Sequence, residues 1–148
     1  MDYLLSVSVL TPKDVIVSFF QSHERVLRFA SGLIYNSSKK AGQMACRKFL
    51  EEGLFTRENC VEMLALGIEL TGYAEKAEIV ERTSDRIVFR LKGSLLGSRL
   101  KSKKPVDTPI AGFIAGWLEA CLERRVDVRE KECVASGHDY CVFEARIR

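Results

Sequence analysis

The sequence predicts an α+β domain, in which N-terminal helices and a four-stranded antiparallel sheet combine with a buried helix that precedes the C-terminal hairpin. Three observations lead to this fold class. Apolar residues recur with a helical period over residues 12–53 and again over 56–72. The period changes to alternation over residues 75–93 and 126–147, which is typical of half-buried antiparallel strands. Between these strand regions, residues 108–124 form an apolar segment at helical spacing.

Length and composition indicate a single globular domain over residues 1–148, with residues 1–10 as an N-terminal arm or strand. The 23 basic and 20 acidic side chains leave a formal charge of only +3, a balance that disfavours a dedicated nucleic-acid binder. No apolar run approaches the roughly 20 residues that a membrane span needs, and the N-terminus has no basic export region. We therefore expect a soluble cytoplasmic protein whose five cysteines are reduced thiols.

The N-terminal helical region begins near Pro12 and ends at Gly53, and Gly32 with the following "YNSS" predicts an interruption or cap. Thr56 is a favourable N-cap for the next helix, which Gly72 ends.

The segment "EKAEIVERTSDRIVFRLKG" predicts two strands joined by a polar turn. Ile87, Phe89 and Leu91 fall on one face of the second strand, and its basic residues fall on the other. The basic residues of the following segment, Arg99, Lys101, Lys103 and Lys104, are typical of a solvated loop.

The apolar helix has Thr108 as its expected cap and Pro109 as its first residue. Gly112, Gly116 and Ala120 form a stripe of small residues, for which we expect close packing against the sheet or a second subunit. The opposite stripe is bulky and includes Cys121, which we interpret as a core thiol. Its members are Ile110, Phe113, Ile114, Trp117, Leu118 and Cys121.

The last two strands place a carboxylate on the buried face of the sheet. Counting by two from Val128 turns Glu130 inward, and Cys141 shares the inward phase of the final strand. An inward carboxylate needs a partner, a proton or a cation. Cys133 is one step out of this phase, so the chain must bulge or leave the strand between Glu130 and Cys133.

The stretch "PIAGFIAGWLEACLERRVDVREKECVASGHDYCVFE" resembles the C-terminal signature of the 4-vinyl-reductase domain family, and "GLIYNSSKKAG" resembles the family's earlier helical segment. The resemblance implies the fold shared by this domain, haem-based nitric-oxide sensors and the transport-particle (TRAPP) subunits of the Golgi. It also implies a cytoplasmic homodimer and an internal apolar cavity for a hydrophobic or aromatic small molecule.

In relatives that serve as phenol-sensing modules, an E-x2-C-x7-C motif binds zinc together with an earlier cysteine that follows a proline. Glu130, Cys133 and Cys141 have the matching spacing, but Ala111 stands where the earlier cysteine is expected. Three interpretations remain: a structural zinc, to which His138, water or a neighbouring side chain adds a ligand; reduced thiols without metal; and a disulfide between Cys133 and Cys141.

The leading functional hypothesis is a stand-alone ligand-binding or sensory domain, with Phe89, Phe113 and Trp117 as candidate ligand-binding residues. For any one of these side chains, ordinary core is the more common role. The alternatives are a reductase of tetrapyrrole metabolism and a scaffold subunit of a larger assembly. The sequence has no dinucleotide fingerprint and no evident nucleophile and base pair, which disfavours the enzyme. A sensor of this length would need a separate output protein.

Overall fold

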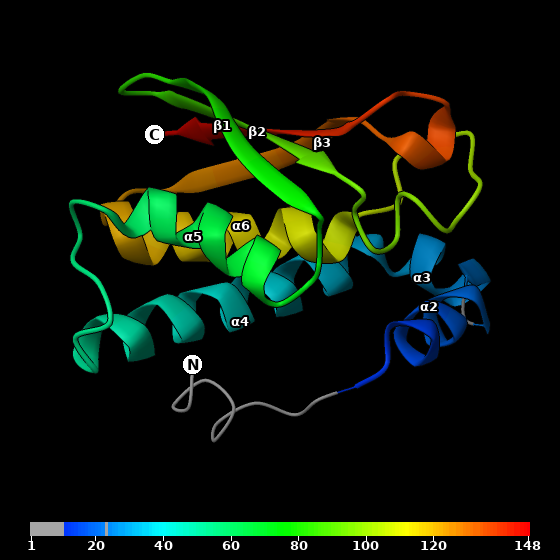
Figure 1. Cartoon of the computed structure of the whole chain (residues 1–148), viewed down its shortest axis with the longest axis horizontal. Helices are drawn as coiled ribbons and strands as arrows, with labels where there is room; N and C mark the ends of the chain where they lie inside the picture. Colours follow the sequence, from blue (N-terminus) through cyan, green and yellow to red (C-terminus); the bar gives the residue numbers. More distant parts are fainter. Residues whose placement is uncertain (1–10, 23) are drawn as a thin grey trace.

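A computed structural model describes residues 11–22 and 24–148 and shows a layered α+β domain. The sheet forms one layer, α5 and α6 lie beneath it, and α4 lies on the far side of α6 (Figure 1). The arm expected at residues 1–10 falls outside the described residues. The helices are α2 (Lys13–Ser22), α3 (Glu24–Phe29), α4 (Ser31–Glu51), α5 (Cys60–Leu70), α6 (Thr108–Leu122) and the 3₁₀ turn η1 (Val134–Ser136), and the strands are β1 (Lys76–Arg82), β2 (Arg86–Lys92), β3 (Val126–Glu132) and β4 (Cys141–Ile147).

The predicted fold class is confirmed. All three strand pairings are antiparallel, and the strand order is β1-β2-β4-β3, so the two hairpins pair through β2 and β4. Ile87, Phe89 and Leu91 are almost fully buried, as their alternation predicts. Among the described residues, no helix is both long enough and apolar enough to cross a membrane.

Two predictions about helix boundaries are wrong. The interruption lies at Ala30, between α3 and α4, and α4 then runs through Gly32 and the "YNSS" segment without a break. Thr56 does not cap α5, whose N-cap is Asn59. Instead, the Thr56 backbone N–H donates to Asn59 Oδ1 at 2.9 Å in the turn that precedes the helix.

The small residues of α6 face α4, rather than the sheet or a second subunit as expected. A Cβ added to Gly112 would overlap the backbone carbonyl of Tyr35, and one added to Gly116 would overlap that of Lys39. Gly42 of α4 has the same relation to the carbonyl of Phe113. These glycines therefore permit a close approach of the two helix backbones, which offsets their low helix propensity.

A disulfide joins α5 to α6, which corrects both the expectation that all five cysteines are reduced and the interpretation of Cys121 as a free core thiol. Cys60 and Cys121 are bonded with a Cα–Cα distance of 6.0 Å, although 61 positions separate them. The remaining thiols, Cys46, Cys133 and Cys141, are free and buried.

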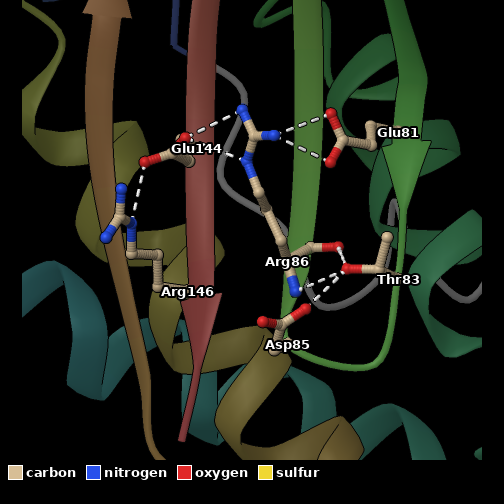
Figure 2. Close-up of polar contacts among 6 residues, drawn as sticks. All are labelled: Glu81, Thr83, Asp85, Arg86, Glu144 and Arg146. Atoms are coloured by element: carbon tan, nitrogen blue, oxygen red, sulfur yellow. Dashed lines mark hydrogen bonds and ion pairs between the residues drawn. The ribbon is translucent and has the colours of Figure 1, made fainter.

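The outer face of the sheet carries a ladder of paired charges. Figure 2 shows Arg86 of β2 between Glu81 of β1 and Glu144 of β4. Arg86 donates to both Glu81 oxygens at 2.8 and 2.9 Å and to Glu144 Oε2 at 2.9 Å, and Arg146 Nε donates to Glu144 Oε1 at 3.0 Å. Glu144 is only 8% exposed, because the two arginines cover its carboxylate. The ion pairs connect side chains of the three strands β1, β2 and β4.

Candidate functional site

The β3–β4 hairpin brings Glu130, Cys133 and Cys141 together. The strand register shifts between Glu130 and Glu132, which is the irregularity that phase counting predicts. Glu130 lies opposite Phe143, and the shift lets the chain turn Cys133 inward, where both Cys133 and Cys141 are fully buried. One carboxylate oxygen of Glu130 and the two Sγ atoms are potential ligand atoms that all lie within 4.8 Å of one another.

The loop between β2 and α6, residues 93–107, covers the two thiols. Ser94 Oγ lies 3.2 Å from Cys141 Sγ, and the two Sγ atoms are 3.8 Å apart. A Cβ added to Gly97 would lie 2.5 Å from Cys141 Sγ and 3.5 Å from Cys133 Sγ, so only glycine allows this close cover. Val17 of α2 packs against Leu95 and Leu96, which holds the loop in place. Figure 1 shows the loop and η1 at the same end of the molecule.

A second carboxylate adjoins the cluster, and sequence reasoning missed it. Asp107 is fully buried and is the N-cap of α6, which corrects the prediction that Thr108 is the cap. Its backbone N–H donates to Glu130 Oε2 at 2.8 Å, and its Oδ1 accepts a short hydrogen bond from the hydroxyl of Tyr73. The polar "VDTP" segment could have drawn attention to Asp107, but nothing local in the sequence places it beside Glu130.

One oxygen of each carboxylate has no hydrogen-bond partner. Glu130 Oε1 and Asp107 Oδ2 are both buried and unpartnered, although Ser94 and the backbone of Gly97 lie near enough to Asp107 to lower its pKa. Leaving a buried carboxylate oxygen unpaired costs free energy on the order of 1–3 kcal/mol. The region therefore has more hydrogen-bond acceptors than the nearby hydrogen-bond donors and positive charges satisfy.

The ionisation of these groups reflects this shortage. Burial, reinforced by the nearby Asp107, raises the pKa of Glu130 to about 9, and burial raises the pKa of Asp107 to about 6. The hydrogen bond between the thiols lowers the pKa of Cys141 and, together with burial, raises that of Cys133. A bound cation would stabilise the charged forms of all these groups, which burial disfavours.

The donor set fits zinc. Two thiolates and a carboxylate are among the ligands that tetrahedral zinc takes in proteins, and the buried, unpartnered oxygen of Glu130 is free to coordinate. His138, the substitute ligand considered from the sequence, is not part of the cluster. Its Nδ1 lies 3.9 Å from Glu132 Oε2 and its side chain is 50% exposed.

The candidate ligand-binding residues lie in or against the main core. Phe89 and Trp117 are buried, and Phe113 is half-buried and packs against the same core. Trp117 contacts three phenylalanine rings, with centroid distances of 5.3 Å to Phe55 and 6.1 Å to both Phe49 and Phe113. Its indole N–H donates to the Cys60 carbonyl at 2.8 Å.

Two surface hollows occur elsewhere in the described structure. Both lie where α4, α6 and the start of β3 meet, and both are lined mainly by charged side chains, including Lys39, Glu119 and Arg125. Neither hollow includes Phe89, Phe113 or Trp117. In this structure the aromatic side chains pack on one another.

Together, the sheet order, the helix buried beneath it and the thiol–carboxylate hairpin define the class of protein, an α+β domain with a candidate metal centre in its last hairpin. Residues 87–147, from β2 to the end of β4, match the family model of the vinyl-4-reductase domain. The resemblance to the vinyl-reductase domain family is therefore confirmed for this part of the chain. No curated protein matches the sequence of the chain.

Three solved structures share the fold over nearly the whole chain. The phenol-responsive sensory domain of the transcription activator PoxR, solved with phenol, has a TM-score of 0.79 at 17% identity and covers 95% of this chain and 76% of its own. A vinyl-4-reductase family protein from Methanocaldococcus jannaschii has a TM-score of 0.68 at 23% identity. The match covers 99% of this chain and 87% of that protein's chain. The third structure is a trafficking protein particle complex subunit 3 from Naegleria fowleri, covalently bound to palmitic acid. It has a TM-score of 0.72 at 16% identity, and the match covers 92% of this chain and 95% of that chain.

Proposed function

We propose that this chain is a small-molecule-binding sensory domain whose C-terminal hairpin is held by a structural zinc. The observation that carries the proposal is the convergence of Glu130, Cys133 and Cys141 at a buried hairpin within the part of the chain that matches the family model. The fold shared with a phenol-responsive sensory domain supports the ligand-binding part. Zinc would supply the positive charge that the two buried thiols and the unpartnered Glu130 oxygen call for.

The zinc would act structurally. It would join β3, β4 and the turn between them. The loop between β2 and α6, at Ser94 and Gly97, would cover the zinc. Two thiolate ligands are typical of zinc sites that hold a fold together, and both sulfurs here are fully buried.

The ligand would bind beside Trp117, and Phe89 and Phe113 would contribute apolar surface from the sheet and from α6. The indole N–H is already occupied by the Cys60 carbonyl, so a ligand there would meet ring faces and aliphatic side chains. Such surroundings suit a hydrophobic or aromatic molecule with few polar groups. Because these rings pack on one another, binding would require side chains around Trp117 to move.

We also propose that the domain works as a cytoplasmic homodimer that signals to a separate output protein. Several large apolar side chains of the N-terminal helices are exposed, and apolar surface of this kind is typical of contact regions. The most exposed are Val15, Phe19, Phe29, Leu33 and Met44.

The zinc is tested by native mass spectrometry of protein purified without chelator, with denatured protein as the reference. We expect an excess mass of one zinc per chain, which is lost in Cys133→Ser and kept in Cys46→Ser, since Cys46 is a buried free thiol outside the cluster. Metal-free wild-type protein under zinc-replete conditions would rule out the zinc site. The same spectra report whether the native particle is a dimer.

Ligand binding is tested through the fluorescence of Trp117, which is the only tryptophan of the chain. We expect phenol and alkyl-substituted phenols to change this fluorescence saturably in wild-type protein. Phe113→Ala should weaken the response, whereas Phe19→Ala, at an exposed position of α2, should leave it unchanged. A linear change, with no saturation for any member of the series, would argue against an aromatic ligand at this place.

A further inference from the structure

We propose that Asp107 is the fourth ligand of the metal centre, taking through its Oδ2 atom the place that Ala111 cannot fill. This inference rests on the proposed zinc at Glu130, Cys133 and Cys141 and assigns the remaining ligand. It is carried by the position of Asp107 in the fold and by the hydrogen bonds that its carboxylate makes and lacks.

The side chain of Asp107 does not cap α6, although Asp107 is the N-cap residue of this helix. An aspartate at a helix N-cap normally accepts a hydrogen bond from a backbone N–H of the first turn, which stabilises the helix by about 1 kcal/mol. Asp107 is the N-cap of α6, yet its side chain makes no such bond. Its carboxylate is therefore directed to other partners, although a capping site lies next to it.

One carboxylate oxygen is held and the other is free. The Tyr73 hydroxyl donates to Oδ1, while Oδ2 is buried without a hydrogen-bond partner. Carboxylates that bind metals are commonly oriented by a hydrogen bond to the oxygen that does not coordinate. Tyr73 would thus be a positioning residue that presents Oδ2 for coordination.

The backbone of Asp107 fixes it beside a candidate ligand. Its N–H donates to Glu130 Oε2 at 2.8 Å, which leaves Glu130 Oε1 as the second buried oxygen without a partner. Asp107 and Glu130 are joined by this hydrogen bond, and each retains one unsatisfied oxygen. The Asp107 carboxylate lies outside the group of ligand atoms that are within 4.8 Å of one another, so its side chain would turn toward the ion on binding. A single divalent cation that both oxygens then coordinate would satisfy the two together, and two thiolates with two carboxylate oxygens make a four-coordinate set.

Ala111 is one helical turn further into α6, and its backbone N–H donates to the Asp107 carbonyl at 3.1 Å. Its methyl group offers no ligand atom, and the residue is almost fully buried. The start of α6 can therefore still supply a ligand, from a residue one turn earlier.

The test is cobalt substitution, because Co²⁺ bound by thiolates gives charge-transfer absorption that reports the number of sulfur ligands. Apoprotein is titrated with Co²⁺ alone in wild type, Asp107→Cys and Asp139→Cys. Asp139 is an exposed acid in the same hairpin turn and serves as the matched control. We expect Asp107→Cys to raise the thiolate absorption per bound cobalt in the proportion of three sulfurs to two, and Asp139→Cys to leave it unchanged.

A second variant keeps the test decisive if Asp107→Cys does not fold. Asp107→Asn is nearly isosteric, and because losing even an outer partner of a metal ligand commonly weakens binding 10- to 100-fold, it should lower Co²⁺ affinity at least about tenfold in a chelator competition. Circular dichroism of the metal-free variant shows whether it is folded.

The outcomes separate this inference from the proposed zinc site. If wild type binds cobalt and Asp107→Cys leaves the thiolate absorption at the wild-type level, Asp107 is not a ligand and the metal site stands without it. If folded Asp107→Asn binds cobalt as tightly as wild type, the inference is also overturned. If wild-type protein binds no cobalt, both the metal site and the assignment of Asp107 fail.

Discussion

The backbone N–H of Asp107 donates to Glu130 Oε2 across 2.8 Å, and each of these two side chains keeps one buried oxygen without a partner. This contact joins the start of α6 to the last hairpin, beside two thiols that lie 3.8 Å apart. A chain that only needed a core at this point would place apolar side chains there, since unpaired buried carboxylates destabilise a fold. These features support the proposed cation site, since the cluster could hold a metal ion.

Gly97→Ala should disrupt the cover over the thiols. The new methyl group would lie 2.5 Å from Cys141 Sγ and from Ser94 Oγ, so the loop or the thiol must shift. We expect a loss of roughly 1–3 kcal/mol in the free energy of unfolding, typical of overpacking, and a lower zinc content. Urea denaturation and metal analysis measure both. Gly32→Ala, where no atom lies within 4 Å of the new Cβ, is the control, and equal behaviour of the two variants would contradict the assigned role.

Gly116→Ala should separate α4 from α6. A Cβ there would overlap the Lys39 carbonyl, and backbone cannot rotate away as a side chain can. We expect destabilisation of at least about 1–3 kcal/mol. The matched control is Gly67→Ala in α5, where the Cβ meets no atom within 4 Å and the better helix propensity of alanine should stabilise by up to about 1 kcal/mol. Urea unfolding in which both variants gain stability would refute the close helix contact.

Glu144 should make stability depend on pH in the acid range. The hydrogen bond from Arg146, together with Arg86, lowers the pKa of Glu144 below its ordinary value. The folded state therefore keeps this carboxylate charged to lower pH than the unfolded state does, and the stabilisation is present above about pH 4.5 and is lost as the pH falls through the folded pKa.

The corresponding variant is Glu144→Gln, compared with wild type by urea unfolding from neutral to acid pH. The difference in unfolding free energy should be largest near neutrality and shrink as the pH falls below about 4. The exposed Glu58→Gln serves as a control for removing a carboxylate. A difference between wild type and Glu144→Gln that does not vary with pH would show that the ion pairs of Figure 2 do not set this dependence.

The Cys60–Cys121 disulfide should be detectable by alkylation. In denaturant without reductant, three cysteines should react, namely Cys46, Cys133 and Cys141, and all five should react after reduction. Because 61 positions separate the bonded residues, chain-entropy arguments predict that reduction lowers the stability by roughly 4 kcal/mol. Five reactive thiols in unreduced protein would instead support the expectation from composition.

Features set by local periodicity could be predicted from the sequence. Alternation identified both hairpins, and counting by two turned Glu130 and Cys141 inward and required the irregularity before Cys133, which the register shift confirms. These inferences succeed because a strand alternates faces with a fixed period of two. The resemblance of the C-terminal motif is likewise carried by residues close together in sequence, and the family-model match covers that part.

Features that depend on distant segments could not be predicted. The small stripe of α6 indicated close packing but not its partner α4, and the spacing of Cys60 and Cys121 gave no sign that they meet. Asp107 stands next to a Thr-Pro helix start, where a polar residue is ordinary, and only the packing of the start of α6 against the last hairpin brings it to Glu130. The expected interruption lies at Ala30 rather than at Gly32, which is the second residue of α4.

The most direct measurement is X-ray absorption at the zinc edge on protein loaded with one zinc per chain. The proposed centre predicts two sulfur neighbours at about 2.3 Å, from Cys133 and Cys141, and two oxygen neighbours at about 2.0–2.2 Å, from Glu130 and Asp107. Loss of the sulfur shell in the Cys133→Ser, Cys141→Ser double variant would place the metal at this hairpin. A wild-type spectrum with no sulfur shell, or protein that retains no zinc, would contradict the account.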